Sequence, residues 1–450
     1  MLIGGPSYWF HALGGLPVAR PPLPGGADVD VAIVGAGYTG LWTAYYLKRA
    51  DPSLRVMILE REVAGFGASG RNGGWVSGEI AFEGDRRTRL AVYDTVDEVG
   101  RVCTAEGIDC DFLKGGSLSV ATNEVQRARL HRHLEQRRAA GDTEDDARLL
   151  ERDELRDRIR LGGALAAVRT PHCARVQPAS LAIGLAAVVE RMGVVIHEHT
   201  AVREILPGGI ARTDQGDVRA GWVVRATEGY TASIRGSRRR LLPMNSSMIA
   251  TEPLTPEALA AIGWDDAETI HDMANAYVYL QRTADDRIAL GGRGVPYRYG
   301  SRTDRHGEIA AGTVASLERR LRELFPQAAD ARVAHGWSGV LGVPRDWQFA
   351  VGADPERRVA WSGGYVGVGV AAANLGGRIV ADLVRGERSD LVTLPFVGHA
   401  WRRDWEPEPL RYLGVTALYS LYRTADRREA STGRPSRLAG IANKIAGRTH

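Results

Sequence analysis

The chain has 450 residues, of which 44% are hydrophobic and 25% are charged, as in a globular protein large enough for two domains. Its formal net charge of +4 is too small for this length to indicate nucleic-acid binding, and no nucleic-acid motif accompanies it. The three cysteines form no CxxC pair, so the sequence predicts neither a disulfide framework nor a metal site and fits a reducing cytoplasm.

The first 27 residues are rich in proline and glycine, and they predict an extended N-terminal arm that leads into the first strand. The opening decapeptide lacks a basic start and a long apolar core, which argues against a signal peptide. The longest apolar stretch, 365–384, contains Asn374, Arg378 and Asp382, so no membrane-spanning helix is predicted. We therefore expect a cytoplasmic protein without a membrane partner.

The segment 28–60 has the pattern of a dinucleotide-binding βαβ unit. An apolar strand leads into GAGYTG, an apolar helical pattern follows, and a second strand over 56–59 ends in Glu60. An acid 20 residues after Gly40 is expected to bind an unphosphorylated ribose 2′-hydroxyl. Because strand, glycines, helix, strand and acid agree, the sequence predicts dinucleotide binding.

Each position of the glycine turn has a physical role. Gly35 permits the tight turn, Gly37 lets a pyrophosphate approach the backbone, and Gly40 lets the helix pack on the strand. Tyr38 and Thr39 lie between them at the helix start, where free amides and the helix dipole attract phosphate.

The middle of the chain changes pattern twice. Residues 80–160 show charged helical patterns, for example over 125–150, interrupted by a strand at 116–121. The predicted elements that follow are a helix starting near Pro178, strands at 194–196, 200–205, 221–226, 247–251, 276–281 and 288–291, and a helix over 308–325. No tandem repeat or low-complexity segment appears.

Glycine punctuation returns in the last third. A strand beginning at Val359 runs into a glycine loop, and a helix is predicted over 371–384. A glycine loop at a helix start can press against a flat cofactor ring or receive negative charge. The polar tail from 395 onward is predicted to wrap back over the body, with 425–450 loosely ordered.

Blocks spread over 28–393 carry a resemblance to a known family. They are GAGYTG with Glu60, GASGRNGG at 67–74, Gln177-Pro178, HTAV at 199–202, ATEGY at 226–230, WSG at 337–339 with Asp346, and GYVGVG at 364–369. In this order they resemble the FAD-dependent amine and amino-acid oxidoreductases of the D-amino-acid oxidase superfamily, in particular the glycine oxidase, sarcosine oxidase and γ-glutamylputrescine oxidase branch.

The resemblance implies an α/β (α+β) fold with a Rossmann-type FAD-binding domain and a discontinuous, antiparallel-sheet substrate domain. The implied parts are an N-terminal arm at 1–27, the FAD-binding domain at 28–79, 176–234 and 334–393, the substrate domain at 80–175 and 235–333, and a tail at 394–450 that packs on the body.

The resemblance also implies where FAD would lie. The block at 67–74 would lie against the flavin, the backbone of Val202 would meet the adenine, and 364–370 would close under the ring. The expected cofactor-binding residues are Gly35, Gly37, Tyr38, Thr39, Gly40, Glu60, Arg61, Ala68, Ser69, Arg71, Asn72, Gly73, Gly74, Val202, Ala226, Thr227, Gly339, Gly364, Gly367, Val368, Gly369 and Val370. Residues 65–77 contain no histidine and no cysteine follows Cys173, so we expect non-covalent FAD and no metal.

Four residues are candidates for the catalytic or substrate side. Tyr279 lies on a predicted strand, and Arg293 would either bind a substrate carboxylate or phosphonate through its planar fork or form a salt bridge. Trp337 would wall the pocket or pack in the core, and Tyr365 would face the substrate or a dimer surface. His271 has no partner pattern and stays unassigned.

The reaction implied is oxidation of the C–N bond of a primary or secondary amine or amino acid, by hydride transfer to flavin N5 and hydrolysis of the imine. Alternatives are N-oxidation or modified-nucleoside chemistry on the same fold, an NAD-dependent dehydrogenase, and a flavin-binding protein without turnover. Lys114 is the single lysine of the central body, so the acceptor is either O2 or another carrier. The sequence leaves the oligomeric state open.

Overall fold

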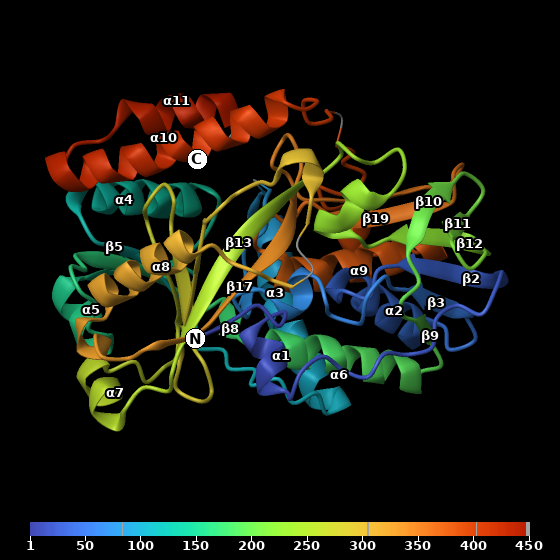
Figure 1. The fold of residues 1–450 in the computed structure, drawn as a ribbon, viewed down its shortest axis with the longest axis horizontal. Helices are drawn as coiled ribbons and strands as arrows, with labels where there is room; N and C mark the ends of the chain where they lie inside the picture. Colours follow the sequence, from blue (N-terminus) through green and yellow to red (C-terminus); the bar gives the residue numbers. More distant parts are fainter. Residues whose placement is uncertain (83, 304–305, 402, 447–450) are drawn as a thin grey trace.

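The computed structural model describes residues 1–82, 84–303, 306–401 and 403–446. Two large sheets occupy opposite halves of the molecule, and helices pack on both (Figure 1). Strands from distant parts of the chain meet in each sheet, so the two halves are built from interleaved segments.

The first sheet has eight strands and a parallel centre. Its strands are β2 (Ala27–Val34), β3 (Val56–Leu59), β9 (Val195–His197), β10 (Val202–Leu206), β11 (Ile210–Thr213), β12 (Asp217–Arg225), β18 (Ala350–Asp354) and β19 (Val359–Gly363). β2 lies between β12 and β3, parallel to both, and β19 also runs parallel to β12. Parallel strands are covered on both faces, which explains the unbroken burial of 31–34 and 56–59.

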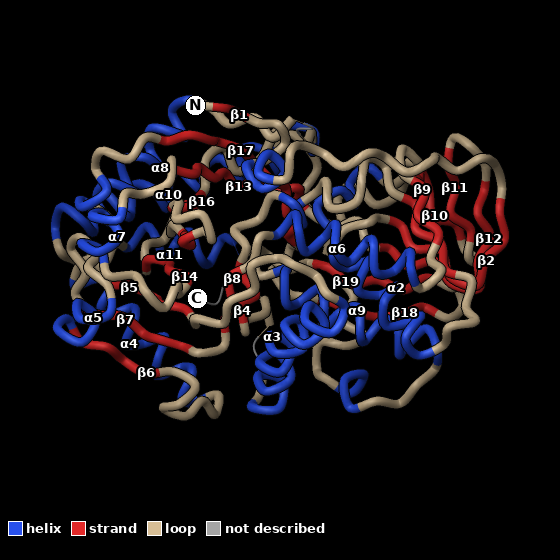
Figure 2. The backbone as a smooth tube through the Cα atoms, turned by 90° about the horizontal axis from the view of Figure 1, so that it is seen from below, coloured by secondary structure: helices blue, strands red, loops and turns tan. Residues whose placement is uncertain are grey.

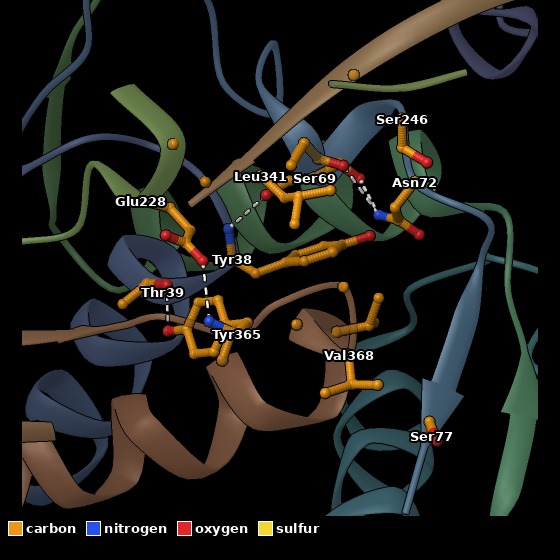
Figure 3. A pocket seen from close by; sticks show the side chains of 18 of the residues that line it. Tyr38, Thr39, Ser69, Asn72, Ser77, Glu228, Ser246, Leu341, Tyr365 and Val368 are labelled. Atoms are coloured by element: carbon orange, nitrogen blue, oxygen red, sulfur yellow. Dashed lines mark hydrogen bonds between the residues drawn. The ribbon is translucent and has the colours of Figure 1, made fainter. Parts of the chain in front are cut away.

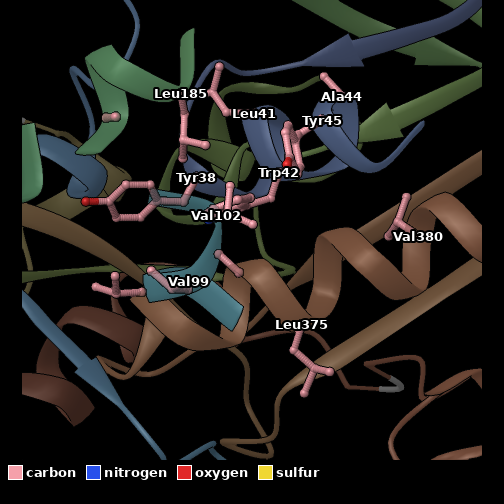
Figure 4. Close-up of a cluster of buried hydrophobic side chains, with 14 of the residues drawn as sticks. Tyr38, Leu41, Trp42, Ala44, Tyr45, Val99, Val102, Leu185, Leu375 and Val380 are labelled. Atoms are coloured by element: carbon pink, nitrogen blue, oxygen red, sulfur yellow. The ribbon is translucent and has the colours of Figure 1, made fainter. Parts of the chain in front are cut away.

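Four helices build the core beside this sheet: α2 (Tyr38–Ala50), α3 (Arg86–Glu106), α6 (Pro178–Arg191) and α9 (Gly369–Arg385). Leu41, Leu185 and Leu375 are fully buried among them (Figure 4). A Cβ on Gly377 would lie 2.7 Å from Cβ of Trp42, so the glycine lets α9 come close to α2. These contacts hold the N-terminal ends of both helices at one edge of the sheet.

The second sheet has nine strands and is mainly antiparallel. In spatial order they are β1 (Leu2–Ile3), β17 (Val333–Val343), β13 (Leu242–Thr251), β16 (Ile288–Gly292), β15 (Tyr279–Arg282), β14 (Thr269–Asp272), β5 (Ser117–Ala121), β7 (Ala166–Thr170) and β6 (Arg148–Glu151). β4 (Trp75–Ser77) and β8 (Cys173–Arg175) form a separate pair. The predicted fold class is confirmed, whereas the domain boundaries stay a prediction. The sheet contains β17, although 334–343 was assigned to the cofactor domain.

The remaining short elements are α1 (Tyr8–Ala12), α4 (Glu124–Ala139), α5 (Arg152–Arg158), α7 (Pro256–Ile262), α8 (Ala311–Leu324), η1 (Ala68–Gly70), η2 (Glu228–Ser233), η3 (Tyr299–Ser301), η4 (Pro326–Ala328) and η5 (Asp390–Thr393). The arm predicted to be extended contains α1, because Trp9 and Phe10 are buried. The helical pattern over 125–150 ends at Ala139, since Leu150 pairs with Ala167 in the sheet. Figure 2 shows α4, α5 and α7 at the end opposite β10–β12.

Two helices, α10 (Leu410–Thr432) and α11 (Arg437–Ala446), form the C-terminal region and run along the edge of the molecule beside α4 (Figure 1). Val415 and Ala442 are buried in a cluster that also contains Leu242 and Val343. The expected loose order is therefore wrong for 425–446, because an apolar face packs on the sheet; 447–450 lie outside the described residues. None of the helices in the described ranges combines the length and hydropathy needed to cross a bilayer.

Candidate active site

A cavity of about 1020 Å³ is lined by residues of both large sheets. Val34 and Ala226 border it from the parallel sheet, and Ser246 and Tyr279 border it from the antiparallel sheet. Figure 3 shows side chains from several elements converging on this space. The cavity lies at the carboxyl ends of parallel strands, where open α/β sheets bind ligands.

The glycine turn after β2 forms a cradle at the start of α2. Gly35 has φ +107°, and a Cβ there would lie 2.7 Å from the carbonyl oxygen of Ala226. Gly37 caps α2 without a side-chain hydrogen bond, and Oγ of Ser69 accepts a hydrogen bond of 2.9 Å from the amide of Tyr38. Gly37, Tyr38 and Thr39 border the cavity, so a helix N-terminus opens into it.

Glu60 lies at the end of β3 and borders the same space. Its carboxylate accepts hydrogen bonds of 2.8 Å from the amides of Ala36 and Glu62, and burial raises its pKa. Two donors leave lone pairs on the carboxylate for further partners, such as ribose hydroxyls. Beside it, the Arg61 guanidinium lies 4.8 Å from the ring centroid of Tyr230.

The loop at 67–74 is braced by its own polar side chains. Nδ2 of Asn72 donates to the carbonyl oxygens of Ala68 at 3.1 Å and Ser69 at 2.9 Å, and its Oδ1 accepts from the amide of Gly74. Arg71 is only 2% exposed, and its Nε donates to the carbonyl oxygen of Phe66 at 2.8 Å. Arg71 thus braces the loop, and it also borders the cavity.

A second glycine loop, residues 364–370, closes the cavity from the start of α9; we call it the clasp. Val368, Gly369 and Val370 border the cavity, and no side chain caps the helix at Val368. The hydroxyl of Tyr365 lies 2.7 Å from Oγ1 of Thr39, and its ring stacks on Phe349 at 5.5 Å. Tyr365 therefore ties the clasp to α2, and it also borders the cavity.

Two helix N-termini from opposite ends of the chain thus open into one cavity, with the Glu60 carboxylate beside the first. This arrangement fits a dinucleotide that carries phosphates and a flat ring. A family model described as "FAD dependent oxidoreductase" matches residues 30–383. The chain belongs to this family of FAD-dependent oxidoreductases. Its cofactor is FAD, which replaces the alternative of an NAD-dependent dehydrogenase.

Relatives of this FAD-dependent oxidoreductase include gamma-glutamylputrescine oxidoreductase of Escherichia coli K12, which is 31% identical over 87% of this chain and 92% of the relative. A probable oxidoreductase OrdL of Rhizobium meliloti is 27% identical over 86% of this chain and 90% of the relative. Among solved structures, glycine oxidase from Geobacillus kaustophilus has a TM-score of 0.72 and 24% identity, covering 82% of this chain and 98% of its own. This last likeness supports the fold alone.

Most predicted cofactor positions meet at the cavity. Those that border it are Gly35, Gly37, Tyr38, Thr39, Glu60, Arg61, Ala68, Ser69, Arg71, Asn72, Gly73, Val202, Ala226, Thr227, Gly339, Gly367, Val368, Gly369 and Val370. Gly40, Gly74 and Gly364, all in the described part of the chain, do not border it. Gly40 lets α2 pack closely on β2, and Gly74 lies against Gln281. At both positions the glycine allows a close approach of the backbone that a Cβ would prevent.

The four substrate-side candidates divide. Tyr279 borders the cavity, and its hydroxyl lies 2.9 Å from Oγ of Ser246. Trp337 does not border the cavity: its side chain is 0% exposed, and its Nε1 donates to the carbonyl oxygen of Arg71 at 2.9 Å. Of the two roles expected for Trp337, pocket wall or core packing, the structure shows core packing.

Arg293 borders the cavity next to the clasp, with Nη2 3.9 Å from the place that a Cβ on Gly367 would take. No acid within the described residues pairs with Arg293, and its Nη1 is buried without a hydrogen-bond partner. The salt bridge offered as an alternative at this position is therefore absent from the described residues. A guanidinium in this situation is prepared for an incoming anion.

Several residues that line the cavity were not predicted from the sequence. Trp75, His271 and Tyr277 line a chamber beyond Tyr279, and α4 contributes further side chains to it, among them Arg137. No local pattern marks these residues, because tertiary packing brings them together.

Glu228 lies within the ATEGY block and is not among the predicted site residues, although an acid just after a strand is a signal that the sequence shows. Its Oε1 accepts a hydrogen bond of 3.1 Å from the amide of Tyr365, and its Oε2 is buried without a partner (Figure 3). Burial raises the pKa of Glu228 to about 7, against the lowering effect of backbone amides.

Proposed function

We propose that this FAD-dependent oxidoreductase oxidises the C–N bond of a primary or secondary amine or an amino acid. The observation that carries the proposal is the chamber beyond Tyr279, which opens from the cofactor end of the same cavity and is lined by aromatic and polar side chains. Bound flavin supplies the acceptor for a hydride equivalent. The name of one relative, gamma-glutamylputrescine oxidoreductase, supports an amine as the donor.

The residues of the chain orient the substrate and shape its field. Tyr279 and Ser246 form a hydrogen-bonded pair at the junction between the cofactor end and the chamber. The uncapped start of α9 presents amides and the positive end of its dipole to the cavity, where they favour negative charge on a reduced ring. An amine whose C–H bond lies at this junction needs no strong protein base, because the hydrogen leaves carbon as a hydride, with both electrons of the C–H bond.

Arg293 is proposed to bind the carboxylate of an amino-acid substrate near the clasp. A buried guanidinium without an acid partner binds a carboxylate through two parallel N–H donors. We further propose that FAD is held without a covalent bond and that the acceptor is O2 or another carrier. A cytoplasmic location is part of the proposal, supported by Cys103, Cys110 and Cys173, which are all free thiols.

The deciding experiment is an anaerobic titration of the purified protein with a panel of amines and amino acids, followed in the flavin absorption spectrum. We expect at least one class of amine to bleach the flavin, and heat denaturation to release a yellow supernatant. Admitting air afterwards distinguishes an oxidase, whose colour returns with peroxide, from a dehydrogenase, whose colour returns only with an added dye. A flavin that no amine bleaches, while a chemical reductant does, would contradict the proposed function.

A further inference from the structure

We propose that the chamber contains a cation-binding subsite built on Glu79, and that the preferred substrates are amines with a second positively charged group. This inference rests on the proposed amine oxidation and adds the chemistry of the substrate's distal end. It concerns the part of the cavity lined by β4, β14 and α4, away from the clasp.

Glu79 follows β4 and projects into the chamber. Its side chain is 47% exposed, it borders the cavity, and it makes no hydrogen bond to the described residues. The nearest cation is Arg137, whose Nη1 lies 3.8 Å from Oε1 of Glu79. Burial acts to raise the pKa of Glu79, but the positive charge nearby, foremost that of the Arg137 guanidinium, lowers the pKa overall, so the group is a carboxylate at neutral pH.

The two arginines nearest to Glu79 in the chamber wall, Arg137 and Arg89, share a single carboxylate, Asp142. Nε of Arg137 lies 2.7 Å from Oδ2 of Asp142, and Nε of Arg89 lies 2.7 Å from Oδ1 of the same carboxylate. The Asp142 side chain is 0% exposed, so this pairing is shielded from water. Because these guanidinium groups donate to Asp142, Glu79 keeps open acceptor positions toward the chamber.

Another arginine at the chamber wall is also paired: Nη2 of Arg129 lies 2.9 Å from Oε2 of Glu429 on α10. Burial lowers the pKa of His133 to about 4, which leaves it neutral, and Nε2 of His271 lies 2.7 Å from Oγ of Ser119. Within the described residues Glu79 thus makes one long ion pair, to Arg137, and no hydrogen bond, so its remaining acceptor positions are open to a cationic ligand.

Aromatic faces line the way from the junction to Glu79. The ring centroid of Trp75 lies 6.3 Å from that of Tyr279 and 6.1 Å from that of His271. The ring centroids of Tyr277 and His271 lie 6.2 Å apart. These rings bury the methylene chain of an alkylamine and also attract an ammonium group. A substrate that reacts at the junction thus has an apolar path that ends at an anion.

The charges along this path separate three kinds of substrate. A diamine places its distal ammonium group at Glu79, whereas a monoamine of equal length leaves that carboxylate with the Arg137 contact alone. A distal carboxylate would meet Glu79 as a like charge, which costs binding energy. The subsite therefore selects by charge at the far end, independently of the chemistry at the reacting end.

The test uses the holoenzyme and a length-matched trio at several chain lengths: an n-alkylamine, the α,ω-diamine and the ω-amino acid. We expect kcat/KM for anaerobic flavin reduction to be about 10- to 100-fold higher for the diamine than for the monoamine. In Glu79→Gln this ratio is expected to fall to about one. Glu135→Gln, which removes an exposed acid from α4, is the matched control and keeps the ratio.

The outcomes separate the two proposals. If amines bleach the flavin but diamines and monoamines react alike at every length in the unaltered protein, the subsite is overturned and amine oxidation stands. A preference for the ω-amino acid would also overturn it and would assign the chamber to Arg137. If no amine bleaches the flavin, both proposals fall. The substrate series on the unaltered protein decides the matter even if the Glu79 variant folds poorly.

Discussion

The hydroxyl of Tyr365 lies 2.7 Å from Oγ1 of Thr39, and 326 residues separate the two positions in the chain. Thr39 belongs to the first turn of α2, and Tyr365 belongs to the clasp that leads into α9. The same hydroxyl lies 3.0 Å from Oγ of Ser362 (Figure 3). This buried contact holds the two helix N-termini at a fixed separation, which is what a cofactor with phosphates at one end and a ring at the other requires.

We expect Tyr365→Phe to weaken FAD binding by roughly 2- to 13-fold, because it removes a buried hydrogen bond worth about 0.5–1.5 kcal/mol. The dissociation constant is measured by titrating apoprotein with FAD and following flavin fluorescence. Tyr299→Phe is the control, since the Tyr299 side chain is exposed. Equal dissociation constants for Tyr365→Phe and the unaltered protein would show that the contact does not hold the cofactor site together.

Gly35→Ala is expected to give protein purified largely without flavin. Gly35 has φ +107°, and the new methyl group would meet the carbonyl oxygen of Ala226 at 2.7 Å, which strains the cradle by about 1–3 kcal/mol or more. The flavin-to-protein absorbance ratio checks this. The control is Gly386→Ala, at φ +73° with nothing within 4 Å of the added Cβ, so it isolates backbone strain from crowding. Loss of flavin in both variants would show that the contact between the added methyl group and Ala226 is not the cause.

The stability of the protein should depend on pH through Glu228, whose pKa burial raises from 4.5 to about 7. The folded state then holds this proton more tightly than the unfolded state, so the stabilisation is complete below about pH 4.5 and is lost as pH rises through about 7. Glu228→Gln stays neutral, and we expect it to remove this loss, which amounts to at most about 3 kcal/mol.

Urea unfolding at a series of pH values measures this effect as the change in the free energy of unfolding between about pH 5 and 8. Glu135→Gln, which alters an exposed acid on α4, should keep the pH slope of the unaltered protein. Identical slopes for Glu228→Gln and the unaltered protein would assign the pH dependence to other groups.

Arg293→Gln should raise KM for amino acids about 10- to 100-fold, because a charge-assisted bidentate contact to the carboxylate is lost. Amines without a carboxylate serve as the internal control, and their KM should change far less. Steady-state kinetics with matched amine and amino-acid pairs provides the measurement. A parallel rise for both kinds of substrate would mean that Arg293 shapes the site without binding the carboxylate.

Asp426 on α10 positions the wall of the chamber from outside the family-model match. Its Oδ1 accepts from the amide of Asn275 at 2.8 Å, and its Oδ2 accepts from the amide of Ala276 at 2.9 Å, beside the cavity residue Tyr277. We expect Asp426→Asn to lower kcat/KM about 3- to 10-fold with an unchanged flavin spectrum, since one of these contacts is weakened. Arg427→Gln on the exposed face of α10 is the control. A change in flavin binding would place the effect in the fold instead.

The cofactor end could be predicted because local backbone rules govern it: glycines at 35, 37 and 40, an acid at a strand end, and a glycine loop before a helix. The chamber could not, because His133 and Arg137 look like any charged residues on a solvated helix until the fold brings them to the cavity. Trp337 stayed open between two roles, since a buried aromatic residue has the same sequence pattern in a core as in a pocket wall. The loose order expected for the C-terminal tail was wrong because the buried positions of α10 and α11 are spaced among charged residues.

The two halves of the cofactor site leave the ribosome at very different times. The glycine turn at 35–40 is synthesised first, but β12, the strand that neighbours β2, comes nearly 200 positions later, and the clasp begins at Gly364. In a nascent chain the cradle at the start of α2 is therefore present long before the clasp has been synthesised. Stable loading has to wait until most of the polypeptide has been made, so flavin availability matters at the end of biosynthesis and not at its start.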